Sequence, residues 1–366
     1  MELVTPTLAM HMANELLSVP IAAVTLLAAA ACVIVAASRA EKTLNPERMP
    51  LMGVMGAFVF AAQMINFTLP VMPGTSGHLG GGVLLAIVLG PAAAIVTITA
   101  ILAVQCLLFQ DGGLLALGCN IINMGVVPCL VGWGIYRVLL GPVERAGQWR
   151  QYLAAWAACL VGVTAGAALV PLEAMVSGVL LISTAHFLGV MVGVHLIIAF
   201  VEGLITFAVV AYLRQVRPAV LGLTAADDPS QRLGRKAVAA SLVITSVLVA
   251  GVVAWFASGY PDGLEWSYLE HRYGDREESV AEPAPTIAAV GEWQSKYSPL
   301  SDYTRREAPL GEVAAEIEED EEGESTWPAV DVWGSLAGIL GTAVTLALVY
   351  GIARLLRRRR PLPARP

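Results

Sequence analysis

The stretch PVMPGTSGHLGGGVLLAIVLGPAAAIVTITAILAVQCLLFQDGGLLALGCNIINMGVVP, residues 70–128, decides the fold of this 366-residue chain. Long apolar segments alternate in it with glycine-rich turns, and one of these turns carries a histidine, His78. From Met49 to Gln110 the chain has no Asp, Glu, Lys or Arg. Polar groups in such a segment must find partners within the protein, because a lipid environment offers none. His78 is therefore a candidate site residue.

The composition indicates a polytopic α-helical membrane protein. Hydrophobic residues make up 57% of the chain and charged residues 14%, with a mean hydropathy of +0.69, whereas soluble domains average roughly 25% charged residues. Several apolar runs reach the ~20 residues that a helix needs to cross a bilayer. The sequence contains no glycine-rich phosphate-binding loop, metalloprotease motif or serine-nucleophile motif. It therefore predicts a protein that is not an enzyme, with any ATP hydrolysis supplied by another subunit.

The apolar runs predict nine membrane crossings. The expected spans are residues 19–38, 49–69, 79–89, 92–109, 114–140, 156–170, 179–213, 237–256 and 332–352. The third run is short for a crossing, and it ends before Pro91, a residue that suits the first turn of the next helix. The expected fold class is thus all-α, with a seven-helix bundle followed by two further transmembrane helices that flank an acidic segment.

Charge is segregated along the chain. Residues 260–330 carry 18 acidic and five basic side chains, and the other basic residues gather at 39–48, 137–150, 214–236 and 354–365. Since short cytoplasmic loops are enriched in Lys and Arg, we expect a multi-pass protein of the cell (inner) membrane. Its N-terminus and acidic segment would be extracytoplasmic, and its C-terminus cytoplasmic.

The acidic segment has two parts with different expectations. The distal run EVAAEIEEDEEGE is typical of a solvated or disordered charge run, and attraction of cations is the alternative. The proximal stretch PDGLEWSYLE predicts a helix start at which Asp262 accepts hydrogen bonds from exposed backbone N–H groups.

Three of the five histidines are weaker site candidates. His271 lies in the acidic segment and is expected at the surface. His186 and His195 lie on one predicted span, and Glu202 shares a helix face with His195 because it follows about two turns later. An ionisable residue in an apolar span is costly unless it is paired or faces a cavity. Glu202 and His195 therefore have either a structural hydrogen-bonding role or a role in transport or coupling.

His11 and His78 form the stronger pair, because the expected topology puts both on the same side of the membrane. If the chain began at Met10, a free amine, the backbone nitrogen of His11 and the His11 imidazole would follow one another closely. His78 adds a fourth nitrogen. Four nitrogen donors favour square-planar Ni(II) or Cu(II) and also hold Co(II). The alternative is that His78 is only a hydrogen-bonding residue of a turn.

Several stretches resemble a known family: MHMANELLSVP, PGTSGHLGGG, LGPAAA, QDGGLLALGCNIINMG and GVHLIIAFVEGLIT. They are similar to the motifs of CbiM/NikM, the substrate-binding (S) components of energy-coupling factor (ECF) cobalt and nickel importers. This resemblance covers roughly Met10 to Leu213. The stretch that begins at Pro261 with PDGLE, flanked by two spans, resembles the PDGLE domain, which is related to the small CbiN/NikN partner. The chain thus resembles a fusion of two membrane proteins.

The resemblance implies a division of the chain into five parts. In order these are a leader or mis-assigned start (1–9), a metal-binding membrane domain (10–213), a basic cytoplasmic linker (214–236), a PDGLE/CbiN-like domain (237–356) with the external segment 260–330, and a basic cytoplasmic tail (357–366).

The resemblance also implies a function and a site. The chain would capture Co²⁺, for cobalamin biosynthesis, or Ni²⁺ as the transported ion, with no permanently bound cofactor. The ligands would be the Met10 amine, the backbone nitrogen and side chain of His11, and the side chain of His78. The neighbours that orient them would be Gln63, Asn66, Asn120 and Asn123. Nitrogen ligands alone do not choose between cobalt and nickel.

The implied partners are a CbiQ/NikQ-like transmembrane coupling subunit, CbiO/NikO-like ATP-binding subunits and the lipid bilayer, with no nucleic acid. One departure from the family is that nine residues precede the motif that begins at Met10. An amide nitrogen at Met10 cannot serve as the amine ligand, so we expect the chain to start at Met10 or the leader to be removed. The alternative function is a membrane scaffold or assembly protein whose histidines are structural.

Overall fold

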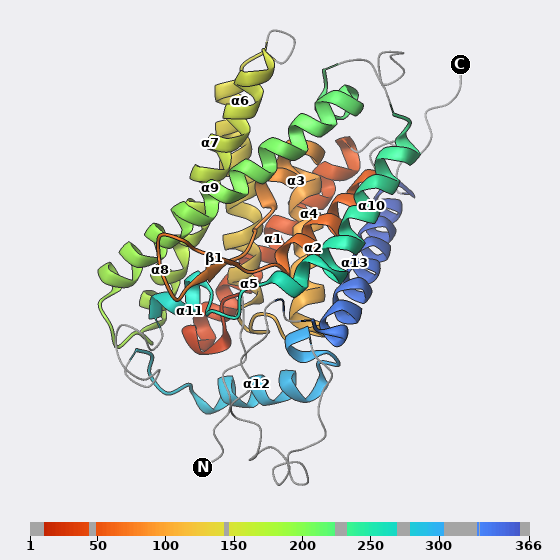
Figure 1. The fold of residues 1–366 in the computed structure, drawn as a ribbon. Coiled ribbons are helices and arrows are strands. Elements are labelled where there is room, and N and C mark those ends of the chain that lie inside the picture. The colour runs from red at the N-terminus through yellow and green to blue at the C-terminus, as the bar shows by residue number, and fades with distance from the viewer. Residues whose placement is uncertain are drawn as a thin grey trace.

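The computed structural model describes residues 11–43, 49–142, 146–223, 233–268, 279–303, 328 and 330–358. Met10, His271, the leader 1–9 and the distal acidic run lie outside the described residues. The described residues are mostly helical, which confirms the predicted all-α membrane fold (Figure 1).

Six helical stretches in the described part are long and apolar enough to cross a membrane: Val19–Thr43, Pro91–Leu108, Leu117–Leu140, Gln148–Ser177, Thr184–Val216 and Val332–Arg357. Two shorter apolar helices, Met49–Gln63 and Lys236–Gly251, accompany them. On the first stretch, Leu27 is 72% exposed and Ile34 66% exposed. Large apolar side chains that face outward along a helix are expected where the surroundings are lipid.

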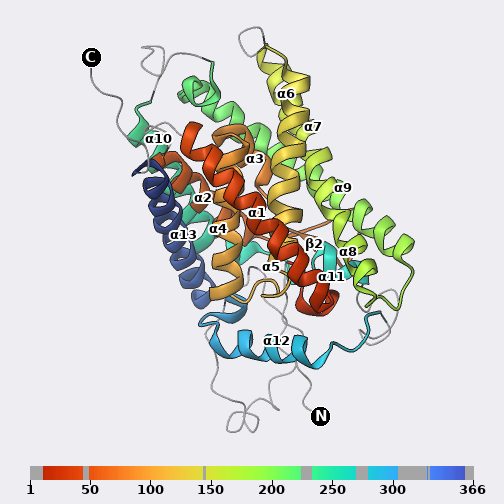
Figure 2. The same cartoon turned by 180° about the vertical axis from the view of Figure 1, so that it is seen from behind.

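The N-terminal part of the described chain forms eleven helices and short helical segments before the long helix α9. They are η1 (Asn14–Leu16), α1 (Val19–Thr43), α2 (Met49–Gln63), α3 (Gly82–Leu89), α4 (Pro91–Leu108), α5 (Leu117–Asn120), η2 (Ile121–Val126), η3 (Pro128–Gly132), α6 (Trp133–Leu140), α7 (Gln148–Ala167) and α8 (Leu169–Ser177), followed by α9 (Thr184–Val216). Helix α1 crosses the outer face of this bundle (Figure 2).

The C-terminal part adds helices to two places on this bundle. Its elements are η5 (Pro218–Leu221), α10 (Arg235–Gly251), η6 (Val253–Phe256), α11 (Gly263–Tyr268), α12 (Pro285–Tyr297), η8 (Ser301–Tyr303) and α13 (Val332–Arg358). Helices α10 and α13 pack against α2, while α12 lies across one end of the bundle, opposite to α6 (Figure 1).

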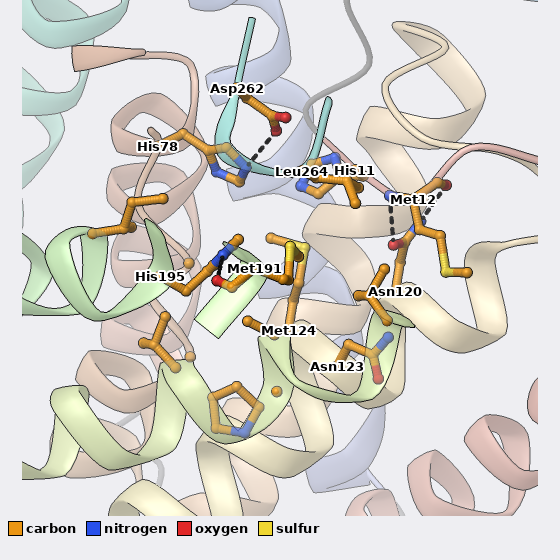
Figure 3. Close-up of a pocket in the computed structure, with 18 residues that line it drawn as sticks. His11, Met12, His78, Asn120, Asn123, Met124, Met191, His195, Asp262 and Leu264 are labelled. Carbon is orange, nitrogen blue, oxygen red and sulfur yellow. Dashed lines mark hydrogen bonds and ion pairs between the residues drawn. The ribbon is translucent and has the colours of Figure 1, made fainter. Parts of the chain in front are cut away.

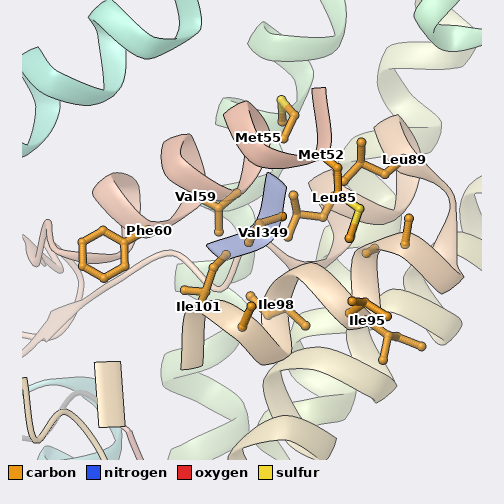
Figure 4. Close-up of a cluster of buried hydrophobic side chains, with 14 of the residues drawn as sticks. Met52, Met55, Val59, Phe60, Leu85, Leu89, Ile95, Ile98, Ile101 and Val349 are labelled. Atoms are coloured by element: carbon orange, nitrogen blue, oxygen red, sulfur yellow. The ribbon is translucent and has the colours of Figure 1, made fainter. Parts of the chain in front are cut away.

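The main core lies between α2, α3, α4 and α13 (Figure 4). Lipid tails are as apolar as these side chains, so close packing rather than water exclusion holds such helices together. Gly56 illustrates the fit, because a Cβ atom there would lie 3.1 Å from Thr97 Cγ2 and 3.2 Å from Val349 Cγ2. Helix α13 of the C-terminal part is thus packed into the core of the N-terminal part.

Element boundaries differ from the expected spans where turns interrupt the apolar runs. The expected span 79–89 is the buried eight-residue helix α3, bounded by glycines with positive φ at positions 81 and 90. Pro91 opens α4 at its first turn, as predicted. The expected span 49–69 ends at Gln63, because residues 67–77 form a hairpin of β1 (Phe67–Thr68) and β2 (Ser76–Gly77).

Two other spans also differ from expectation. Residues 114–140 contain two π-helical segments, η2 and η3, between α5 and α6. The second of them begins at Pro128, which has no N–H to donate to the helix. The span expected at 156–170 begins at Gln148 instead and continues through α8 to Ser177.

We predict that Gly118→Ala destabilises the protein. Gly118 lies in α5, where a Cβ atom would overlap the backbone of Thr25 and Leu26 in α1. Backbone cannot rotate away, so overpacking costs about 1–3 kcal/mol and outweighs the roughly 1 kcal/mol by which Ala normally favours a helix over Gly. Thermal unfolding in detergent measures the effect.

The matched control is Gly134→Ala in α6, where a Cβ atom has no neighbour within 4 Å. This variant is expected to unfold at or above the wild-type temperature. Equal stability of the two variants would contradict the close contact of α1 with α5.

Candidate metal-binding site

His11 and His78 lie side by side although 66 residues separate them in the sequence. Their ring centroids are 5.3 Å apart and the planes meet at 74° (Figure 3). His11 precedes η1, and His78 directly follows β2. The structure therefore brings together the two side chains that the sequence suggested as ligands, while Met10 lies outside the described residues.

Asn120 holds the N-terminal segment in place. The backbone N–H of Met12 donates to Asn120 Oδ1 at 3.0 Å, and Asn120 Nδ2 donates to the Met12 carbonyl at 3.2 Å. The same carbonyl accepts from the Gly113 N–H at 3.0 Å. Asn120 ends α5, so this clamp ties the residue next to His11 to the bundle.

The QDGG turn after α4 fits closely against His11. Gly112 has φ +89°, and a Cβ atom there would lie 2.8 Å from His11 Cβ and 3.0 Å from Asn120 Nδ2. The turn therefore requires glycine for both its backbone conformation and its contact. Two residues beyond the turn, the Leu115 N–H donates to Asn14 Oδ1 at 2.8 Å.

Asp111, within the same turn, is a site residue that the sequence analysis did not single out. His11 Nδ1 lies 2.7 Å from Asp111 Oδ1, and Tyr303 donates its hydroxyl to Asp111 Oδ2 at 2.8 Å. The available signal was that Asp111 is the first charged residue after the uncharged stretch 49–110. His11 Nε2 is buried and has no hydrogen-bond partner among the described residues.

The pair of His11 and Asp111 favours charge on both partners. Burial acts to lower the pKa of His11, but the Asp111 carboxylate, together with Asp262, outweighs burial and raises that pKa above its usual value. Burial likewise acts to raise the pKa of Asp111, whereas His11, and after it the Tyr303 hydroxyl, bring that pKa below its usual value. A bound cation would replace the imidazolium proton as the positive partner of this carboxylate.

The turn that carries His78 is fixed from two helices. Glu202 in α9 accepts from the backbone N–H groups of Gly80 at 2.7 Å and Gly81 at 3.0 Å. Gln63, at the end of α2, donates to the Gly80 carbonyl at 2.8 Å. His195, on the same helix as Glu202, contacts the Met191 carbonyl through Nδ1 at 2.9 Å.

Of the other residues considered in the sequence, Asn123 lines the cavity beside His11 and His78, whereas Asn66 and His186 lie outside it. Asn123 donates to Glu173 Oε2 at 2.7 Å and lines the same cavity as His11 and His78. Asn66 follows α2, and its backbone carbonyl accepts from the Ser258 N–H at 2.7 Å. Neither Asn66 nor His186 lines the cavity.

The C-terminal part covers the site with the start of its acidic segment. Asp262 is buried and places Oδ2 3.7 Å from His78 Nε2 (Figure 3). Burial raises the pKa of Asp262 to about 7. Its Oδ1 accepts from the Glu265 N–H at 2.8 Å, which confirms the predicted cap at the start of α11. The proximal acidic segment therefore touches the His78 turn.

Gln294 of α12 connects the N-terminal segment at Asn14 with the QDGG turn and its neighbours. Its Nε2 donates to the carbonyls of Gly112 at 2.8 Å and Cys106 at 3.1 Å. Its Oε1 accepts from the Leu114 N–H at 2.9 Å and from Asn14 Nδ2 at 3.3 Å. Each of these contacts spans at least 180 residues of sequence, so no local pattern could have indicated them.

A cavity of about 70 Å³ lies at the centre of these groups. Its polar lining includes His11, His78, Asn120, Asn123, His195 and Asp262, and three methionines also line it: Met12, Met124 and Met191. This volume accommodates an ion with a water molecule. In the described part of the chain, no three His, Cys, Asp or Glu side chains are spaced to hold a metal by themselves.

Comparison with known proteins identifies both halves of the chain. Residues 11–220 match the CbiM family, described as the cobalt uptake substrate-specific transmembrane region, and residues 236–358 match the PDGLE domain. The fused nickel transport protein NikMN of Rhodobacter capsulatus is 31% identical over 84% of this chain and 93% of its own length.

Two further relatives match this chain over different shares of its length. A NikMN relative from Archaeoglobus fulgidus is 31% identical over 84% of this chain and 86% of its own length. A truncated transition metal transporter of known crystal structure is 34% identical, covers 56% of this chain and 97% of its own, and superposes with a TM-score of 0.48. With a family match over more than half its length, this chain is a multi-pass membrane protein that belongs to the CbiM family and is fused to a PDGLE domain.

Proposed function

We propose that this chain is the subunit that captures Co²⁺ or Ni²⁺ for an ATP-driven importer of the ECF type. The observation that carries the proposal is the meeting of His11 and His78 at one cavity. The family description and the names of the fused relatives support a metal ion as the transported substrate. Cobalt would serve cobalamin biosynthesis.

The proposed ligands are the Met10 amine, the backbone nitrogen and side chain of His11, and the side chain of His78. The clamp on Met12 supports this set, because it fixes the chain two residues after the proposed amine. An amine at Met10 requires a chain that begins there, so residues 1–9 would be absent from the active protein. The ring nitrogen that can chelate an ion together with the His11 backbone nitrogen is Nδ1, so His11 would exchange its Nδ1 contact with Asp111 for the ion.

The proposed topology places the site on the outer side of the cell (inner) membrane. The N-terminal segment, the His78 turn and the proximal acidic segment meet at one region of the bundle, which supports a common side for all three. The basic linker 214–236 and the tail 357–366 would be cytoplasmic. There they would lie within reach of CbiQ/NikQ-like and CbiO/NikO-like partners. The CbiO/NikO-like subunits would hydrolyse ATP.

Metal titration tests the proposal directly. The detergent-purified chain begun at Met10 is expected to bind Co²⁺ and Ni²⁺ in isothermal calorimetry with one site per chain. The 366-residue form and His78→Ala are expected to lose at least tenfold in affinity, because each lacks one of the four nitrogen donors.

Two results would contradict this proposal. Binding that is equal in all three forms would remove Met10 and His78 from the site. No binding in any form would favour a membrane scaffold whose histidines are structural.

Gly112→Ala is expected to weaken metal binding more than it weakens the fold. The added methyl group meets His11 and Asn120, so the proposed ligand segment must shift. The control is Gly74→Ala, because Gly74 has a similar φ of +82° but no neighbour within 4 Å of a Cβ atom. Both variants carry the backbone strain, and only Gly112→Ala should lower the affinity in calorimetry. Equal affinities would show that the QDGG turn does not position His11.

Gln294→Ala is expected to weaken metal binding although the residue is remote from the ion. The change leaves the Gly112 and Cys106 carbonyls and the Leu114 N–H without their side-chain partner. A buried polar group left unsatisfied costs about 1–3 kcal/mol, which loosens the turn against His11. Calorimetry with Co²⁺ should show a several-fold loss, whereas the exposed neighbour Glu292→Gln should bind like the wild type. An unchanged affinity in Gln294→Ala would mean that α12 does not brace the site.

A further inference from the structure

Asp262 presents a carboxylate oxygen to the ring of His78. Its Oδ2 lies 3.7 Å from His78 Nε2, and the whole residue is 4% exposed. The residue belongs to the second family region, whereas both histidines of the site belong to the first. Figure 3 shows Asp262 above the cavity, on the side of His78.

The position of Asp262 is fixed by contacts of its side chain and of its backbone. Oδ1 caps α11 by accepting from the Glu265 N–H. The backbone pairs with the His78 turn, because Ser76 and Asp262 form a β-bridge and the Ser76 N–H donates to the Pro261 carbonyl at 2.9 Å. One carboxylate oxygen therefore serves the helix cap, and the other is held toward His78.

The ring of His78 is oriented by a second contact. Its Nδ1 lies 3.2 Å from the Leu79 carbonyl. Nε2 is the ring nitrogen near Asp262 Oδ2, and both residues line the same cavity as His11. A cation between Nε2 and Oδ2, whether a proton or a metal ion, stabilises this approach.

The separation fits two ligands of one ion. Imidazole nitrogens and carboxylate oxygens lie about 2.0–2.2 Å from an ion such as Zn²⁺, so two of them on the same ion are about 3–4 Å apart. The 3.7 Å between Nε2 and Oδ2 falls in this range without any movement of either side chain.

Charge favours the same arrangement. Two neutral imidazoles contribute no negative charge, and a divalent ion in a buried site is costly unless charge of opposite sign compensates it. Asp111 already contacts His11 and the Tyr303 hydroxyl. Asp262 supplies a second buried carboxylate, which balances the ion.

We propose that Asp262 Oδ2 is a direct ligand of the transported ion, so that the two family regions hold the captured metal jointly. This inference rests on the proposed function and adds an oxygen ligand to its nitrogen set. The PDGLE region is then part of the binding site rather than only a cover for it.

Asp262→Asn tests the inference, because Asn keeps the size of the side chain and caps helices as well as Asp does, while it removes the charge and the anionic ligand. In calorimetry with Co²⁺ and Ni²⁺, the chain begun at Met10 and carrying Asp262→Asn is expected to bind each ion at least tenfold more weakly than the same chain without the substitution. The absorption bands of bound Co²⁺ should shift, and the unfolding temperature should stay close to that of the wild type. Asp262→Ser, which also retains a capping oxygen, is expected to behave alike.

The matched control is Glu265→Gln, which removes a buried carboxylate on α11 that does not line the cavity. Its affinity and Co²⁺ spectrum should match those of the wild type. Equal losses in Asp262→Asn and Glu265→Gln would overturn direct ligation in favour of a distant effect of charge. Wild-type affinity and spectrum in Asp262→Asn would overturn this inference alone. The proposed function would be overturned if the wild type bound neither ion, or if His78→Ala left its affinity unchanged.

Discussion

The paired hydrogen bonds between the Asn120 side chain and the Met12 backbone are the contact on which the site depends. They hold an N-terminal segment of the chain inside a helical bundle, where an extended backbone would otherwise leave its polar groups unsatisfied. Because the amide of Asn120 is buried, loss of either bond is expensive, and the segment has one well-defined position. His11 reaches His78 only from that position, and the glycine at 112 leaves the space for it.

The two family regions contribute different chemistry to this centre. The first region provides the imidazoles and Asp111, and the second provides Tyr303, Gln294 and Asp262, which contact these groups or the turns beside them. Helices α10 and α13 anchor the second region in the core next to α2, so its loops are held over the site by the packing of the bundle. Because both regions belong to one chain, each meets the other at a high effective concentration. A separate subunit would first have to associate.

The sequence predicted the parts of the structure that depend on local pattern. Hydropathy placed the long helices, Pro91 marked the first turn of α4, and Asp262 was expected as a helix cap. The pairing of His11 with His78 followed from a common side of the membrane. Asp111, Gln294 and Tyr303 were not predicted as site residues, because their contacts with the site depend on tertiary packing between segments 100 or more residues apart. The hairpin at residues 67–77 was also missed. Its first apolar residues continue the apolar pattern of α2, so the expected span ran into it.

The most direct test of the account is X-ray absorption spectroscopy of the protein loaded with one equivalent of Co²⁺ or Ni²⁺. The account predicts a first shell of nitrogen and oxygen at about 2 Å, with the outer scattering of two imidazole rings. His78→Ala should reduce that scattering to one ring. A sulfur shell from the methionines of the cavity, or a spectrum without imidazole scattering, would contradict the account.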